Sequence, residues 1–116
     1  MDNSYAIKFL GKIVTIKIDR PIGSKHPKHD SVYEVKYGFV PNTKASDGEE
    51  IDAYLLGVGK PVDEFTGKCI AVIHRKDDND DKLVIVPEDT KKINDEDIFK
   101  AVNFQEKWFD FEILRK

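Results

Sequence analysis

The sequence predicts a single, mainly β domain in which short strands close, or nearly close, into an antiparallel barrel. Three observations support this prediction. Five short segments of alternating or continuous apolar residues are separated by glycine, proline and acidic turns. Only one stretch, near the C-terminus, has the spacing of an amphipathic helix. The chain of 116 residues is long enough for one hydrophobic core and too short for two, so residues 1–116 are expected to form one domain.

The first two predicted strands flank a polar connection. Residues 13–18 alternate apolar and polar side chains, as a strand with one buried face does, and a proline and a glycine follow them. Residues 24–30 are polar and basic, which is typical of a loop. Residues 32–40 are rich in aromatic and β-branched side chains and stop at a proline, so they are expected to form the second strand.

Three more strands are predicted after an acidic turn. Residues 52–58 follow that turn directly. Residues 69–74 form a nearly continuous apolar run, which indicates a strand buried on both faces. A second acidic loop precedes residues 83–86, which end at Pro87. A final short strand over residues 111–114 is compatible with the pattern.

One helix is expected, beginning after Asn94. The Asn94 side chain can cap it, and Asp97 at the third helical position is a variant of the capping box. The aromatic residues that follow could form a ligand platform, but such a stripe is more often a helix face packed on a barrel. The predicted buried face comprises Ile98, Ala101, Val102, Gln105, Trp108 and Phe109, with Phe99, Phe104 and Phe111 in the aromatic stripe.

Composition favours a soluble globular protein in the cytoplasm. Apolar residues make up 40% and charged residues 35% of the chain, and no apolar run approaches the length that spans a membrane. The N-terminus lacks a secretory signal pattern, and the single cysteine, Cys69, cannot form an intrachain disulfide. The net charge of −3 hides a segregation, because residues 20–36 are rich in cations and residues 47–52 and 77–81 in carboxylates. This segregation suggests that an anion is held beside cations.

The most informative stretch is the acidic turn before residues 52–58. Asp47, Glu49, Glu50 and Asp52 place four carboxylates within six residues. Like charges this close repel, so they must either face water or surround a cation, and hard divalent cations prefer such oxygen ligands. Asp52 has the opposite parity to Asp47 and Glu49, so a kink near Gly48 or Ile51 is needed to converge all three. From this turn alone, a metal site and a solvated acidic turn are about equally supported.

The second acidic loop shifts the balance towards metal. Asp77, Asn79 and Asp81 have the spacing of a calcium-binding loop, but Lys82 stands where that loop requires glycine, and the flanks resemble strands. An EF-hand is therefore excluded. Two acidic loops at the mouths of neighbouring strands favour a shared metal site. The three histidines of the chain are not expected to contribute to this metal site. His26 and His29 are separated by a proline, and His74 is expected to be structural.

These residues resemble the soluble family I inorganic pyrophosphatases. The resemblance lies in Tyr37-Gly38-Phe39-Val40-Pro41 followed by Asp47-Gly48-Glu49-Glu50-Ile51-Asp52, and in Asp80-Asp81-Lys82-Leu83-Val84 followed by Pro87. It covers residues 13–88 and is far more specific as a combined spacing than either loop alone. It implies a five-stranded OB-like barrel with a packed helix, Mg²⁺ as cofactor with Mn²⁺ as a possible substitute, and hydrolysis of pyrophosphate to two phosphates.

The resemblance also implies roles for individual residues. Glu49 stands where the family has the aspartate that orients the attacking water, and Tyr37 matches a tyrosine near the metal centre. Lys82 matches a lysine that contacts the anion or steadies the acidic cluster, and Asp19 matches an outlying carboxylate. Asp78 is a rival of Asp77 for its place in the shortened loop. The implied metal ligands are Asp47, Asp52, Asp77 and Asp80.

The anion-binding half departs from the family pattern. The family has a hairpin that supplies a lysine and an arginine to the phosphate, and this hairpin is absent or collapsed into residues 23–30. Lys25, Lys28 or Arg20 would have to substitute for it. The family's helical Tyr-Lys pair is replaced by Trp108-Phe109. Pyrophosphate remains the expected substrate, with another phosphoanhydride as the alternative.

The chemistry is consistent with this assignment. Divalent ions neutralise the oxygens of a phosphoanhydride and lower the pKa of a water from 15.7 towards about 7, and Asp52 is the expected shared ligand. Glu49 reaches one methylene further than the expected aspartate, roughly 1 Å, and its carboxylate is still expected beside those of Asp47 and Asp52 around one cavity.

The sequence leaves two alternative functions, a nucleic-acid-binding module and an inactive relative of the family. An OB-like barrel can bind single-stranded nucleic acid, but the acidic loops and negative net charge oppose a polyanion. The second alternative is a catalytically inactive relative that keeps the barrel and binds a phosphorylated ligand. The sequence is also compatible with a homo-oligomer.

Overall fold

The computed structural model describes residues 4–25, 32–45, 48–76 and 80–115. Within these residues it contains two helices and six strands. In chain order these elements are α1 Ser4–Ile7, β1 Ile13–Arg20, β2 Lys36–Val40, β3 Ile51–Leu55, β4 Glu64–Arg75, β5 Lys82–Val86, α2 Asp95–Glu106 and β6 Phe111–Leu114. No helix among the described residues is long and apolar enough to cross a membrane.

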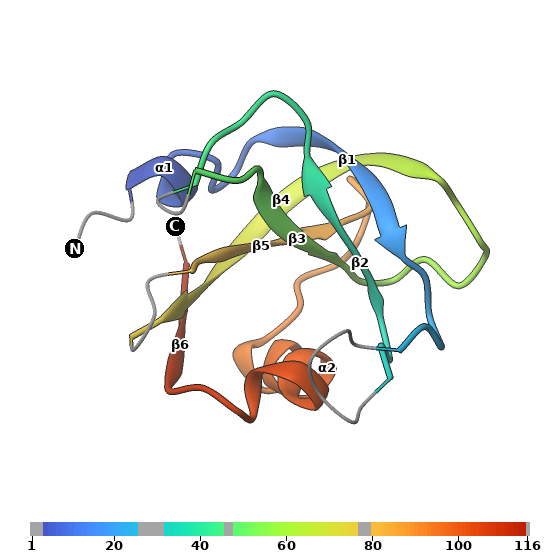
Figure 1. Cartoon of the computed structure of the whole chain (residues 1–116). Helices are drawn as coiled ribbons and strands as arrows, with labels where there is room; N and C mark the ends of the chain where they lie inside the picture. The colour runs from blue at the N-terminus through green and yellow to red at the C-terminus, as the bar shows by residue number, and fades with distance from the viewer. Residues whose placement is uncertain (1–3, 26–31, 46–47, 77–79, 116) are drawn as a thin grey trace.

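Five of the strands form a closed barrel. The strand order is β1-β2-β3-β5-β4, and pairing between β1 and β4 closes the ring, while β6 adds to β4 outside it. The helix α2 packs below the barrel, opposite the end where α1 lies (Figure 1). The expected OB-like barrel of five strands with one C-terminal helix is therefore confirmed.

The expectation that every pairing is antiparallel is wrong in one place. Strand directions alternate along the chain, and β5 inserts between β3 and β4 instead of following β4 at the edge. β5 is therefore antiparallel to β4 but parallel to β3, with Asp52 opposite Lys82. Parallel strands begin at the same end of a sheet. The chain segments that enter β3 and β5, which are the two acidic stretches, consequently meet at one end of the barrel.

Three of the predicted strand boundaries differ from the structure by three residues or more, and one of them is the end of β3 at Leu55 instead of residue 58. β2 begins at Lys36, four residues later than expected, and Val32 instead makes an isolated bridge with Lys25. β4 begins at Glu64, five residues earlier than expected, because its polar first half pairs with β1. The short helix α1 was not anticipated. β1 and β2 approach so closely at Gly38 that a Cβ there would lie 1.8 Å from the Lys17 carbonyl oxygen.

Two layers of apolar side chains stabilise the fold. Residues from all five barrel strands join α1 in the first cluster, which fills the barrel and includes the fully buried Cys69. The second cluster lies between the outer face of the barrel and α2. β5 contributes alternate residues to both layers, and all five of its residues are buried.

The helix α2 begins as predicted but ends earlier. The Asn94 side chain accepts a hydrogen bond of 2.8 Å from the Asp97 backbone N–H, which confirms the cap. The helix ends at Glu106, so Trp108 and Phe109 lie beyond it. The aromatic stripe is only partly buried: Phe104 is in the core, whereas Phe99 and Trp108 are 47% and 50% exposed. The expectation that Phe99 and Trp108 pack on the barrel is wrong.

Candidate active site at the barrel mouth

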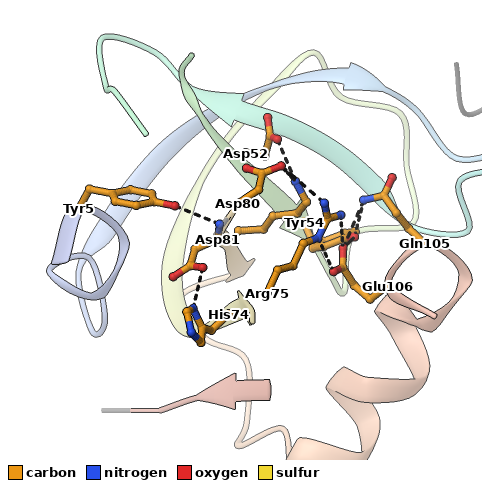
Figure 2. Close-up of polar contacts among 10 residues, drawn as sticks. Tyr5, Asp52, Tyr54, His74, Arg75, Asp80, Asp81, Gln105 and Glu106 are labelled. Atoms are coloured by element: carbon orange, nitrogen blue, oxygen red, sulfur yellow. Dashed lines mark hydrogen bonds and ion pairs between the residues drawn. The ribbon is translucent and has the colours of Figure 1, made fainter. Parts of the chain in front are cut away.

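Strand register brings two carboxylates and a lysine together on the outer face of the barrel. The Lys82 ammonium lies 3.0 Å from Asp52 Oδ2 and 3.1 Å from Asp80 Oδ2. Asp52 and Lys82 are paired across β3 and β5, and Asp80 shares the parity of Lys82. Lys82 is only 2% exposed, so its charge is matched by the two carboxylates in a largely desolvated position. Figure 2 shows Asp52 and Asp80 converging from different segments of the chain.

Tyr37 lies beside this ion-pair cluster on β2. Its ring is 5.4 Å from the Lys82 ammonium. Burial raises the pKa of Tyr37 well above its usual value, and the nearby Asp52 carboxylate adds to this effect. Tyr37 therefore stays protonated at neutral pH, with its hydroxyl in the neighbourhood of Asp52.

An open cavity of about 200 Å³ adjoins the cluster. It is lined by one aromatic residue, Phe39, and by four carboxylates, those of Asp19, Glu49, Glu50 and Asp52. Burial raises the pKa of Asp19; neighbouring Arg20 opposes the shift, whereas Asp52 adds to it. Glu50 accepts a hydrogen bond of 3.2 Å from the Asn42 backbone N–H. Glu49 and Asp52 thus line one cavity.

The donor set suits a hard divalent cation. All the side-chain ligands around the cavity are carboxylate oxygens, and the opening leaves room for water. Among the residues that the structure describes, no three acidic, histidine or cysteine side chains stand close enough to hold a metal by themselves. Asp47 and Asp77 lie outside the described residues, as do Asp78 and Lys28. The described ligands would be Asp52 and Asp80, with Lys82 already reducing the repulsion between them.

A buried polar network that sequence reasoning missed lies behind Asp80. Arg75 at the end of β4 makes a forked contact with Glu106 at the end of α2, with Nε–Oε1 2.8 Å and Nη2–Oε2 2.9 Å. The Tyr54 hydroxyl donates to Glu106 Oε2 at 2.5 Å, and Gln105 Nε2 donates to the Tyr54 oxygen at 2.5 Å. Figure 2 shows these side chains meeting between the barrel and α2. The sequence signals of this network were an arginine at the end of an apolar strand and Gln105 on the predicted buried face of the helix.

The basic residues are less closely associated with the cavity. Neither Arg20 nor Lys25 lines it, and Lys25 is exposed. Arg20 Nη1 donates a hydrogen bond of 3.1 Å to the Asp19 carbonyl oxygen. Burial raises the pKa of Tyr33, and the charge of Arg20 opposes that rise. Lys82 acts on Tyr33 in the same direction. Tyr33, which sequence reasoning also missed, is therefore influenced by cations and carboxylates of the site alike.

His74 is structural, as expected. Its Nδ1 lies 2.8 Å from Asp81 Oδ1, and the Asp81 backbone N–H donates to the Tyr5 hydroxyl at 3.0 Å. Asp81 is fully buried, and its Oδ2 has no hydrogen-bond partner among the described residues. Burial raises the pKa of Asp81, and the hydrogen bond to His74 opposes that shift. Although adjacent in sequence, Asp81 faces away from the cluster that contains Asp80.

Comparison with known proteins identifies the family. A family profile described as inorganic pyrophosphatase matches residues 12–111. The fold matches inorganic pyrophosphatases from Helicobacter pylori (TM-score 0.68, 17% identity, 99% of this chain and 88% of that one) and Ehrlichia chaffeensis (TM-score 0.65, 18% identity, 89% and 85%). It also matches one from Neisseria gonorrhoeae (TM-score 0.61, 21% identity, 84% and 76%). A comparison with curated protein sequences gives no match. The profile match over most of the chain shows that this protein belongs to the inorganic pyrophosphatase family, whose activity is that of an inorganic diphosphatase.

Proposed function

We propose that this chain hydrolyses inorganic pyrophosphate to two phosphates at the barrel mouth, with Mg²⁺ as cofactor and Mn²⁺ as a substitute. Family membership supports the reaction. The observation that carries the location is the parallel register of β3 and β5, which brings Asp52 and Asp80 to one lysine beside a carboxylate-lined cavity.

The proposed metal ligands are Asp47, Asp52, Asp77 and Asp80. When bound, divalent ions supply charge neutralisation of the phosphoanhydride oxygens and a water whose pKa falls from 15.7 towards about 7. Lys82 holds Asp52 and Asp80 at a fixed spacing, because its ammonium contacts both. The protonated Tyr37 hydroxyl is proposed to help orient the neighbouring Asp52 carboxylate.

Glu49 is the proposed general base. It lines the same cavity as Asp52, and its exposed carboxylate can accept a proton from a water that attacks phosphorus. Lys82 is also proposed to place its charge near the anion. Arg20, Lys25 and Lys28 are proposed to stabilise the leaving phosphate from the basic side of the site.

A phosphate-release assay tests the proposal. The purified chain should release phosphate from pyrophosphate with Mg²⁺ or Mn²⁺, and an excess of chelator should abolish the release. Triphosphates and nucleoside diphosphates, assayed in parallel, should be poorer substrates. Full turnover in excess chelator would refute the metal assignment, and a preference for a nucleotide would redirect the substrate to another phosphoanhydride.

A further inference from the structure

Arg75 stands between two carboxylates with different surroundings. On one side it makes the forked contact with Glu106 described above. On the other side its Nη1 lies 3.5 Å from Asp80 Oδ2, a longer and weaker contact. The single positive charge of Arg75 is therefore shared unequally, and Glu106 takes the larger part.

This arrangement is enclosed. Arg75 is 6% exposed and Glu106 is fully buried. The ring of Phe109 covers the guanidinium, with 3.7 Å between the ring centre and the guanidinium carbon. Charges in such a position are weakly screened, so a change in one of them is felt strongly by its neighbours.

Glu106, at the end of α2, accepts several hydrogen bonds from the barrel strands. Besides the two contacts from Arg75, its Oε2 accepts the Tyr54 hydroxyl. The Tyr54 oxygen in turn accepts from Gln105, so the hydroxyl proton is directed to Glu106. The hydrogen bonds from Arg75 and Tyr54 end on the Glu106 carboxylate and stabilise its negative charge.

The consequence concerns Asp80. Asp80 already shares the Lys82 ammonium with Asp52. If Glu106 lost its charge, more of the Arg75 charge would act on Asp80, and Asp80 would become a poorer ligand for a divalent cation. We propose that Glu106 is a positioning residue that sets the divalent-cation affinity of Asp80 by holding Arg75 away from it. This inference rests on the proposed function in one respect, namely that Asp80 is a metal ligand.

The test measures Mg²⁺ binding without substrate, by calorimetric titration of the full chain. Glu106→Gln should weaken binding on the order of 10-fold, the size of effect that one unit charge produces at the effective dielectric of such sites. Adding Arg75→Met to Glu106→Gln should restore binding to within about 3-fold of the parent, because the cation that Glu106 balanced is removed as well. Thermal unfolding of each variant verifies that it is folded.

A matched control is available on the same helix. Glu96 is exposed and forms a surface ion pair with Lys100, with 3.3 Å between Lys100 Nζ and Glu96 Oε1. Glu96→Gln makes the same chemical change and should leave Mg²⁺ affinity unchanged.

Two results would overturn the inference. One is unchanged Mg²⁺ affinity in folded Glu106→Gln, and the other is a double variant that binds as weakly as Glu106→Gln, which would make the loss structural. If Glu106→Gln does not fold, Arg75→Met alone decides, because the inference requires it to bind Mg²⁺ at least as tightly as the parent. Asp80→Asn separates the two proposals: if it leaves Mg²⁺ binding intact, the assignment of Asp80 as a ligand is wrong and the inference falls with it, while phosphate release still tests the reaction independently.

Discussion

The acidic and basic sides of the candidate site are built in different ways. Asp52 and Lys82 are fixed by register within two paired strands, and Lys82 is buried between its partners. Arg20 and Lys25 lie at or beyond the end of β1, and neither lines the cavity. A side chain held by strand pairing keeps its geometry at little further entropic cost, whereas a long exposed cation must be ordered when the anion binds. We therefore expect the acidic side to determine the rate and the basic side to modulate it.

The largest expected effect comes from breaking the acidic side. Asp52→Asn should lower kcat/KM for pyrophosphate on the order of 10³-fold, because it removes a charge from the centre of the site. Lys25→Ala should lower it by less than about 5-fold, in line with the small energies of exposed charges. Phosphate release at saturating and limiting substrate gives both constants. Comparable losses in the two variants would mean that the site is organised around its basic side instead.

Glu49 is the next position at which the comparison can be sharpened. Glu49→Gln should lower kcat about 10²-fold if the carboxylate accepts a proton, and Glu49→Asp should retain most of the activity. Steady-state kinetics over a pH series would show the loss of an ionising group only in the glutamine variant. If all three proteins are equally active, Glu49 is not the base.

A smaller effect is expected at Tyr37. Tyr37→Phe keeps the ring beside Lys82 and removes the hydroxyl that interacts with Asp52. A loss of about 3- to 10-fold in kcat/KM corresponds to one hydrogen bond of roughly 1 kcal/mol. The unfolding temperature, measured alongside, should fall by only a few degrees. A loss as large as that of Asp52→Asn would indicate that Tyr37 has a direct chemical role.

The smallest effect on activity is expected at Asp81, which faces away from the site. Its pKa is raised above the usual 3.8 by burial, although His74 opposes the shift. The stability that the Asp81 carboxyl contributes is therefore fully present below its unfolded-state pKa of 3.8, and it is lost as the pH rises through its folded-state pKa. Asp81→Asn removes this dependence, so its free energy of unfolding relative to the parent should rise with pH across that window. Urea denaturation at several pH values measures it, and the opposite slope would show that the pair with His74 dominates.

Local pattern was sufficient to predict most of the fold. Alternation and turn residues located the barrel strands, and the Asn94 cap located the start of α2. The parallel pairing of β3 with β5 could not be predicted in this way, because five buried residues look the same in either direction. The start of β4 was missed since its polar half lies against β1 and gives no apolar signal.

In the candidate site too, residues in short local patterns could be predicted, and residues joined only by tertiary packing could not. Asp52, Asp80 and Lys82 could be proposed because they lie in two short segments with a recognisable spacing. Arg75 and Glu106 could not, because 31 residues separate them and each alone resembles an ordinary surface charge. Only the packing of α2 against the barrel makes them partners. The roles of the metal ligands and of Glu49 stay predictions.

The buried Cys69 gives the barrel an internal reporter. Burial raises the pKa of its thiol to about 11. Its backbone makes hydrogen bonds with the backbones of Gly11 and Lys12, and it lies where β4 pairs with β5. Thiol reagents attack the thiolate, so alkylation requires the strands around Cys69 to separate. Because the chain has one cysteine, the labelling rate in native buffer measures the frequency of that opening without any introduced probe. The same rate, followed as Mg²⁺ is added, would report how far cation binding at the mouth suppresses opening of the barrel.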